Sequence, residues 1–174
     1  MENVLKFKKL DYVIKNNEDK EVTVKSEGKL PTRATQWSAG VDLYSTRITK
    51  EVDNSGKIVL VYHTDIAVEI PTGYVGLLLM KSSSSKRSLM LANCVGTIDS
   101  DYRGELMAKF KVTTDAVPTI YAEGEAFAQL VIVPCLILTP EFTEELSESE
   151  RGEMGFGEAS VAAESKEEGE VKND

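Results

Sequence analysis

The sequence predicts an all-β domain of the sandwich, jelly-roll or barrel type. Short runs of alternating or β-branched apolar residues follow one another along most of the chain, and turn-forming residues separate them. Short strands with frequent turns are typical of these three architectures. No amphipathic helix is predicted, apart from a possible turn near Leu89–Asn93.

In chain order, the polar stretch Asn16–Gly28 is interpreted as the exposed excursion of a hairpin. Ile58–Tyr62 is a β-branched run of strand length. Leu106–Val112 alternates apolar and polar residues, which indicates a half-buried strand. Val131–Val133 is a second β-branched run. The breakers between these segments are Asn54–Gly56, Pro71–Gly73, Asp115–Pro118 and Glu123–Gly124.

The chain has 174 residues, of which 41% are hydrophobic, and this fits one folded domain. Large apolar residues become rare from Ser147 onward. We therefore predict a β domain over residues 1–140, a flexible C-terminal arm over 141–160 and a disordered acidic tail over 161–174.

The formal net charge of −9 lies wholly in residues 141–174, which contain 12 acidic and 3 basic residues. The neutral body lacks the basic face that sequence-independent binding to nucleic acid needs. The longest apolar run, Leu77–Met80, is far shorter than the ~18 residues of a membrane span, and Met1–Val4 does not resemble a signal peptide. We expect no nucleic-acid or membrane partner and a cytoplasmic location, or the host cytoplasm if the chain is phage-encoded.

The two cysteines, Cys94 and Cys135, form neither a disulfide framework nor a CxxC metal pattern. We expect both to be small buried apolar side chains.

Two polar clusters interrupt the first half of the β pattern. In Ser38–Tyr44, Asp42 is an acid among apolar residues, which is either a turn or ladder residue or a carboxylate near a metal-bound water. Lys81–Arg87 places hydroxyls and backbone N–H groups at a strand end between cations. Such a segment suits phosphate binding, although a flexible serine loop has the same composition.

A third cluster spans Asn93–Glu105. Asp99 and Asp101 are two residues apart, so their side chains point the same way if the chain is extended. Tyr102 and Gly104 suggest a hairpin whose backbone can approach a flat heterocycle. An ordinary acidic turn is the alternative.

The fourth cluster combines Gln129 with the arm segment Arg151–Gly157. Gln129 lies inside an apolar strand, and a buried amide costs about 1–3 kcal/mol unless a ligand or a neighbouring group pairs with it. In the arm, the Arg151 guanidinium can grip a phosphate and the Phe156 ring can cover a base. A glycine-rich linker is the alternative.

In order, these clusters resemble the five motifs of the trimeric dUTP nucleotidohydrolases (dUTPases). The matching segments are Ala39–Leu43, Lys81–Ser83, Gly96–Glu105, Gly124–Leu130 and Arg151–Gly157. The resemblance implies a distorted jelly-roll β-barrel and a homotrimer with sites shared between subunits. It also implies Mg²⁺-dependent hydrolysis of dUTP to dUMP and pyrophosphate, which keeps uracil out of DNA and supplies dUMP for thymidylate synthesis.

The resemblance further implies a role for each residue. Asp99 would be the general base, and Tyr102 would lie under the deoxyribose and exclude a 2′-hydroxyl. Asp42 would hold a water of the Mg²⁺ shell rather than the metal itself. The residues implied to bind uracil or phosphate are Lys81, Ser82, Ser83, Asn93, Gly96, Thr97, Ile98, Gln129, Arg151, Gly155, Phe156 and Gly157.

The chain departs from the family pattern at Lys81, where an arginine is usual, and at Ala126, where many members have Arg or Lys. It also has Glu158 where members commonly have a small hydroxyl residue. A carboxylate there would repel the triphosphate by ~1 kcal/mol or less if it is solvated. Two alternatives stay open: an enzyme similar to the dCTP deaminases, and a regulatory protein that keeps the nucleotide pocket.

Overall fold

The computed structural model describes residues 4–156. The chain divides into two units, Met1–Ile137 and Leu138–Asp174. Every described strand belongs to the first unit, and residues 138–156 of the second contain no helix or strand. No helix among the described residues is long and apolar enough to span a membrane. Gly157 and Glu158, two of the positions singled out in the sequence, lie outside the described residues.

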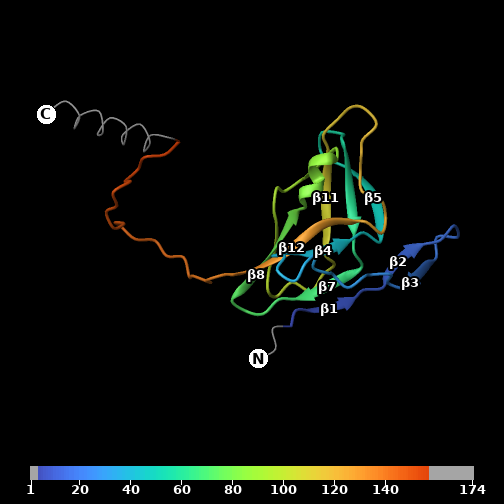
Figure 1. Cartoon of the computed structure of the whole chain (residues 1–174), viewed down its shortest axis with the longest axis horizontal. Helices are drawn as coiled ribbons and strands as arrows, with labels where there is room; N and C mark the ends of the chain where they lie inside the picture. The colour runs from blue at the N-terminus through green and yellow to red at the C-terminus, as the bar shows by residue number, and fades with distance from the viewer. Residues whose placement is uncertain (1–3, 157–174) are drawn as a thin grey trace. The chain divides into compact units, whose positions relative to one another are not determined.

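The first unit is built from antiparallel strands, so the all-β, jelly-roll prediction is confirmed (Figure 1). One four-stranded sheet has the order β10 (Gly96–Ile98), β8 (Tyr74–Met80), β12 (Ala126–Pro134), β4 (Val41–Tyr44). The other has the order β5 (Arg47–Val52), β6 (Ile58–His63), β11 (Met107–Val112), β9 (Leu89–Leu91). Two smaller sheets pair β1 (Lys6–Lys9) with β7 (Ile66–Glu69), and β2 (Tyr12–Lys15) with β3 (Glu21–Val24).

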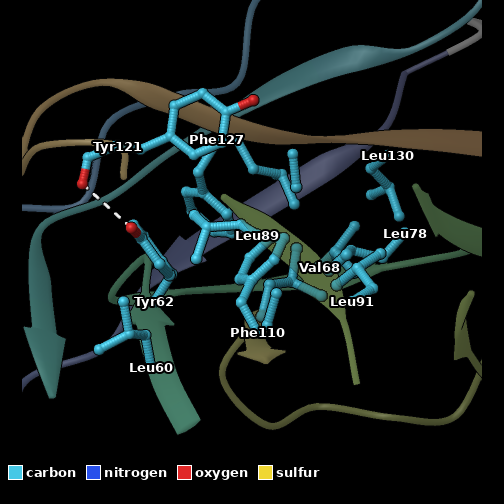
Figure 2. Close-up of a cluster of buried hydrophobic side chains, with 14 of the residues drawn as sticks. Leu60, Tyr62, Val68, Leu78, Leu89, Leu91, Phe110, Tyr121, Phe127 and Leu130 are labelled. Atoms are coloured by element: carbon cyan, nitrogen blue, oxygen red, sulfur yellow. Dashed lines mark hydrogen bonds between the residues drawn. The ribbon is translucent and has the colours of Figure 1, made fainter. Parts of the chain in front are cut away.

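The core lies between the two large sheets and is centred on aromatic rings (Figure 2). The ring of Tyr62 in β6 stacks on Phe127 of β12 at 5.1 Å and meets Phe110 of β11 edge-on at 5.2 Å. The Tyr62 hydroxyl donates a hydrogen bond of 3.0 Å to the carbonyl of Tyr121. Burial raises the pKa of Tyr62 to about 12. These contacts join strands from both sheets.

The strand pattern follows the sequence closely. In β11, Ala108 and Phe110 are buried while Lys109 and Lys111 are exposed, as the alternation predicts. The polar stretch near residue 16 forms the turn of the β2–β3 hairpin, which projects from the body in Figure 1. The predicted exposed excursion is therefore present.

Three local expectations are wrong. Leu89–Leu91 forms strand β9 and not a turn, because it pairs with β11. The serine run forms a 3₁₀ helix, η1 (Ser82–Lys86), instead of an irregular loop. Cys94 is exposed and Cys135 half-buried, because Cys94 lies in the connection before β10 and Cys135 directly follows β12.

Candidate active site

The first part of the site lies on three adjacent strands of one sheet, β8, β12 and β4. Gln129 in β12 is opposite Leu79 of β8 on one side and Asp42 of β4 on the other. Lys81 directly follows β8, and its Nζ lies 2.5 Å from Oδ2 of Asp42. Asp42, Lys81 and Gln129 are 39 or more residues apart in pairs but meet at one end of the sheet. We name this group the phosphate cluster.

The Gln129 amide has a protein partner. Its Nε2 donates a hydrogen bond of 3.0 Å to the carbonyl of Met80. Its Oε1 lies over Gly40, where an added Cβ would be only 2.8 Å away. A neighbouring backbone group therefore pairs with the Gln129 nitrogen, which is one of the two alternatives that the sequence leaves open. Glycine is needed at position 40 because the Gln129 amide packs against the backbone there.

The serines of η1 differ in what their hydroxyls contact. Ser84 and Ser85 donate hydrogen bonds to the carbonyls of Lys81 and Ser82, which fits the three-residue repeat of a 3₁₀ helix. The Ser83 hydroxyl shares a hydrogen bond of 3.2 Å with the Tyr121 hydroxyl. Ser82 is exposed, and within residues 4–156 no hydrogen bond occupies its hydroxyl. Ser82 is thus the hydroxyl best placed to bind a ligand.

The second part of the site is a pocket of about 410 Å³ where the two large sheets separate. It is lined by Leu78, Leu91, Ala92, Asn93, Gly96, Thr97, Ile98, Met107, Ala108 and Lys109. Four residues expected to bind a base, Asn93 and Gly96–Ile98, are among these. We name it the base pocket.

Six residues that line the base pocket were missed from the sequence: Leu78, Leu91, Ala92, Met107, Ala108 and Lys109. Met107 and Lys109 line it from β11. Their signal was the alternation in Leu106–Val112, which places both on the face opposite Phe110. The expected hairpin is absent, because β10 pairs with β8 while β9 pairs with β11, so the pocket-forming segment crosses between sheets.

The chain turns after β10, and this turn carries Asp99 and Tyr102. The Tyr102 N–H donates to the Asp99 carbonyl at 3.1 Å. The segment is therefore not extended, and the expectation that Asp99 and Asp101 share one side of an extended strand is wrong. The Asp99 side chain is exposed.

The Tyr102 ring lies against Gly104. Its hydroxyl donates a hydrogen bond of 3.0 Å to the carbonyl of Glu105. An added Cβ at Gly104 would lie 2.3 Å from the Tyr102 hydroxyl oxygen. Only glycine at position 104 allows this ring position.

The two parts of the site are far apart within one chain. Ile98, the residue before Asp99, is opposite Gly76 of β8, whereas Lys81 lies beyond the other end of that strand. At about 3.3 Å per residue, the five residues from Gly76 to Lys81 separate Ile98 from Lys81 by about 17 Å, and Asp99 follows Ile98. A single chain therefore does not bring Asp99 to the phosphate cluster.

The second unit contains the remaining predicted residues. The Arg151 Nε donates a hydrogen bond of 2.9 Å to the carbonyl of Met154. Phe156 is fully exposed and has a φ of 45°. Within this unit, Arg151, Gly155 and Phe156 lie on one short turn-containing segment.

The carboxylates do not form a metal cage. Among residues 4–156, no three His, Cys, Asp or Glu side chains lie close enough to hold a metal ion together. Asp42 supplies one half-buried carboxylate beside Lys81. A single carboxylate fits Mg²⁺, which keeps several waters and is commonly held by one or two carboxylates and substrate phosphates.

Three comparisons with known proteins agree. A family model described as dUTPase matches residues 26–160. A deoxyuridine 5'-triphosphate nucleotidohydrolase of Desulfitobacterium hafniense is 38% identical over 136 residues, which cover 77% of this chain and 89% of that protein.

Solved structures give the same result. A mutant dUTPase of Staphylococcus bacteriophage 80alpha with dUpNHpp has a TM-score of 0.69 and 30% identity, and the match covers 90% of this chain and 98% of that chain. A mutant dUTPase of S. aureus phage phi11, described with a structural Mg(II) ion, has a TM-score of 0.62 and 28% identity, covering 82% and 98%.

Proposed function

Because this chain belongs to the dUTPase family and its activity is the hydrolysis of dUTP to dUMP and pyrophosphate, we propose that two copies of the chain share each reaction site. The base pocket and Asp99 of one copy face the phosphate cluster of another. The separation of about 17 Å along β8 supports this division, since one copy cannot supply both parts. We propose a homotrimer with three such sites, as the resemblance to the trimeric dUTPases implies.

In the proposed reaction, the ionised Asp99 carboxylate accepts a proton from the attacking water. The water oxygen bonds to the α-phosphorus, the bond from that phosphorus to the α–β bridging oxygen breaks, and pyrophosphate leaves. The exposure of Asp99 supports its role, because the carboxylate can reach a substrate held by a second copy.

The base pocket selects the nucleoside. The Asn93 amide and the backbone of Gly96–Ile98 pair with uracil, and the pocket of about 410 Å³ has room for one small heterocycle. Tyr102 lies against the deoxyribose and leaves no space for a 2′-hydroxyl.

The phosphate cluster, with Ser82, binds the triphosphate. Lys81 supplies positive charge, Ser82 a free hydroxyl and Gln129 an amide. Asp42 would hold a water of the Mg²⁺ shell, and bound Mg²⁺ would supply positive charge against the triphosphate. Arg151 and Phe156 come from the arm of another subunit, with the guanidinium on the γ-phosphate and the ring over the uracil. Gly155 and Gly157 flank Phe156 in the sequence.

The base assignment is tested by Asp99→Asn, with Asp101→Asn as the matched control two residues away. Asp99→Asn should bind a non-hydrolysable dUTP analogue with unchanged Kd while kcat falls about 10²- to 10⁴-fold. Asp101→Asn should keep its kcat. If Asp99→Asn retains kcat, or Asp101→Asn loses it, Asp99 is not the base.

The shared site is tested by complementation between Asp99→Asn and Gln129→Ala. Each variant alone should have low activity. Trimers that contain both chains have sites in which Asp99 and Gln129 are both intact, so co-expression should restore turnover. If mixed trimers form and recover no activity, each site is built from one copy.

A further inference from the structure

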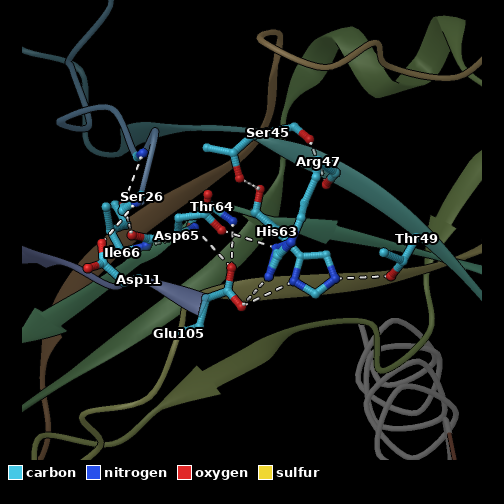
Figure 3. Close-up of polar contacts among 12 residues, drawn as sticks. Asp11, Ser26, Ser45, Arg47, Thr49, His63, Thr64, Asp65, Ile66 and Glu105 are labelled. Carbon is cyan, nitrogen blue, oxygen red and sulfur yellow. Dashed lines mark hydrogen bonds and ion pairs between the residues drawn. The ribbon is translucent and has the colours of Figure 1, made fainter. Parts of the chain in front are cut away.

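Outside the phosphate cluster and the base pocket, a partly buried polar group surrounds the Glu105 carboxylate (Figure 3). The Glu105 Oε1 accepts hydrogen bonds from the Thr64 N–H at 3.1 Å and the Asp65 N–H at 2.9 Å. Its Oε2 lies 3.1 Å from His63 Nδ1 and accepts a weak hydrogen bond of 3.4 Å from Arg47. The side chain is only 15% exposed. We name this group the Glu105 cluster.

The partners of Glu105 are themselves held by other elements. Arg47 forms an ion pair of 3.1 Å with Asp65 and stacks over the Tyr12 ring at 4.1 Å. His63 Nε2 lies 3.0 Å from the Thr49 hydroxyl. The cluster therefore fixes Glu105 from strands β5 and β6 and from the turn before β7.

The Glu105 carboxylate is held in its ionised form. Burial alone would raise the pKa of Glu105, but the hydrogen bonds from Asp65 and His63 and the nearby charges of His63 and Arg47 lower it below its usual value. A neutral amide in its place would satisfy the same partners less well.

The backbone carbonyl of Glu105 in turn holds the Tyr102 side chain. The Tyr102 hydroxyl donates to the Glu105 carbonyl at 3.0 Å, and the ring rests against Gly104. Tyr102 is 39% exposed. The hydroxyl bond is therefore a main restraint on the outer end of the ring.

We infer that Glu105 is a positioning residue for sugar selection: its carboxylate fixes the residue whose carbonyl holds Tyr102 against the deoxyribose. The inference rests on the proposed role of Tyr102. Ribose differs from deoxyribose by one hydroxyl, and rejection by contact requires that the ring cannot move aside. If Glu105 is held less firmly, the Tyr102 ring can move aside, and the site accepts UTP more readily.

The test compares kcat/KM for dUTP with kcat/KM for UTP. The variants are Glu105→Gln, Tyr102→Phe, the double variant and Tyr102→Ala, with Glu69→Gln as the matched control. Glu69 also forms an ion pair, with Lys6 at 3.2 Å, but it is exposed and lies outside both parts of the site.

Glu105→Gln should lower the dUTP/UTP ratio about three- to tenfold, the size expected for one weakened hydrogen bond. Tyr102→Phe removes the hydroxyl that donates to the Glu105 carbonyl, so it should lower the dUTP/UTP ratio by a similar factor. The double variant should lower the ratio by no more than the stronger single variant does, because both changes weaken the same restraint on the Tyr102 ring. Glu69→Gln should keep the wild-type ratio.

Glu105 has only a structural role if Glu105→Gln lowers the melting temperature and leaves the ratio unchanged. If Tyr102→Ala lowers the ratio while Glu105→Gln does not, the inference fails and the role of Tyr102 stands. If Tyr102→Ala keeps the ratio, both the inference about Glu105 and the proposed role of Tyr102 fail. Should Glu105→Gln not fold, Tyr102→Phe decides, and an unchanged ratio there overturns the inference.

Discussion

The Nζ of Lys81 lies 2.5 Å from the Oδ2 of Asp42, so the residues assigned to the triphosphate and to the magnesium shell form an ion pair with each other. Both side chains are mostly buried. A lysine is a single point charge with three donors, whereas an arginine has five donors in a planar fork. Lys81 must therefore divide one charge between Asp42 and a phosphate.

Lys81→Arg should lower the KM for dUTP several-fold with little change in kcat. A guanidinium can bond to Asp42 and to a phosphate oxygen at the same time. Steady-state kinetics of dUTP hydrolysis measure the effect. Lys25→Arg is the control, since Lys25 also pairs with a carboxylate, that of Asp11 at 2.7 Å, but at an exposed position. An unchanged or higher KM for Lys81→Arg would contradict this division of charge.

Gly104→Ala should lower kcat/KM for dUTP about 10- to 100-fold. The added Cβ would lie 2.3 Å from the Tyr102 hydroxyl oxygen and force the ring from its position. A displacement of about 1 Å near a reacting centre has effects of this size. Turnover and thermal melting should be measured on the same samples.

Gly56→Ala is the matched control for Gly104→Ala. Gly56 has a φ of 78° with no atom within 4 Å of the added Cβ, so alanine there is strained but displaces nothing. It should lower stability and keep kcat/KM. If the two variants lose activity in proportion to their loss of stability, Tyr102 displacement is not the cause.

Gly40→Ala should raise the KM for dUTP while the protein still folds. The new methyl group would meet the Gln129 Oε1 at 2.8 Å, and this atom is the free end of a flexible side chain. The amide would turn away, which weakens its bond to the Met80 carbonyl and removes it from the phosphate cluster. Steady-state kinetics with dUTP measure the KM, and circular dichroism shows whether the variant folds. An unchanged KM would show that Gln129 does not bind substrate.

Tyr62→Phe should lower the free energy of unfolding by about 1–2 kcal/mol at neutral pH, because the buried Tyr121 carbonyl loses its partner. The folded pKa of Tyr62, about 12, lies above the unfolded value of 10.0. The stabilisation by Tyr62 is therefore complete below pH 10 and is lost as the pH rises toward 12. Urea titrations of both proteins from pH 7 to 11.5 should show the difference shrinking above pH 10. A constant difference would mean that Tyr62 ionises normally.

Several of the strands could be predicted from the sequence, but contacts between distant residues could not. Alternation in Leu106–Val112 gives the buried face of β11, because side chains alternate on any strand. The pairing of Lys81 with Asp42 depends on β12 lying between β8 and β4. That strand order is a property of the whole fold.

The Glu105 cluster shows the same limit. In the sequence, His63, Arg47 and Asp65 look like ordinary polar residues, and Glu105 stands out only as the last residue of the segment Gly96–Glu105. They come from strands and turns that are up to 58 residues apart. Local pattern carries no signal for such a group, because its members share no spacing.

Release of pyrophosphate from dUTP, UTP, dCTP and dTTP by the wild-type chain with Mg²⁺ tests the central claim most directly. We expect rapid release from dUTP and little from the other three, because the base pocket pairs with uracil and Tyr102 excludes a 2′-hydroxyl. Comparable release from dCTP or dTTP, or tight binding of dUTP with no turnover, would contradict a uracil-specific hydrolase.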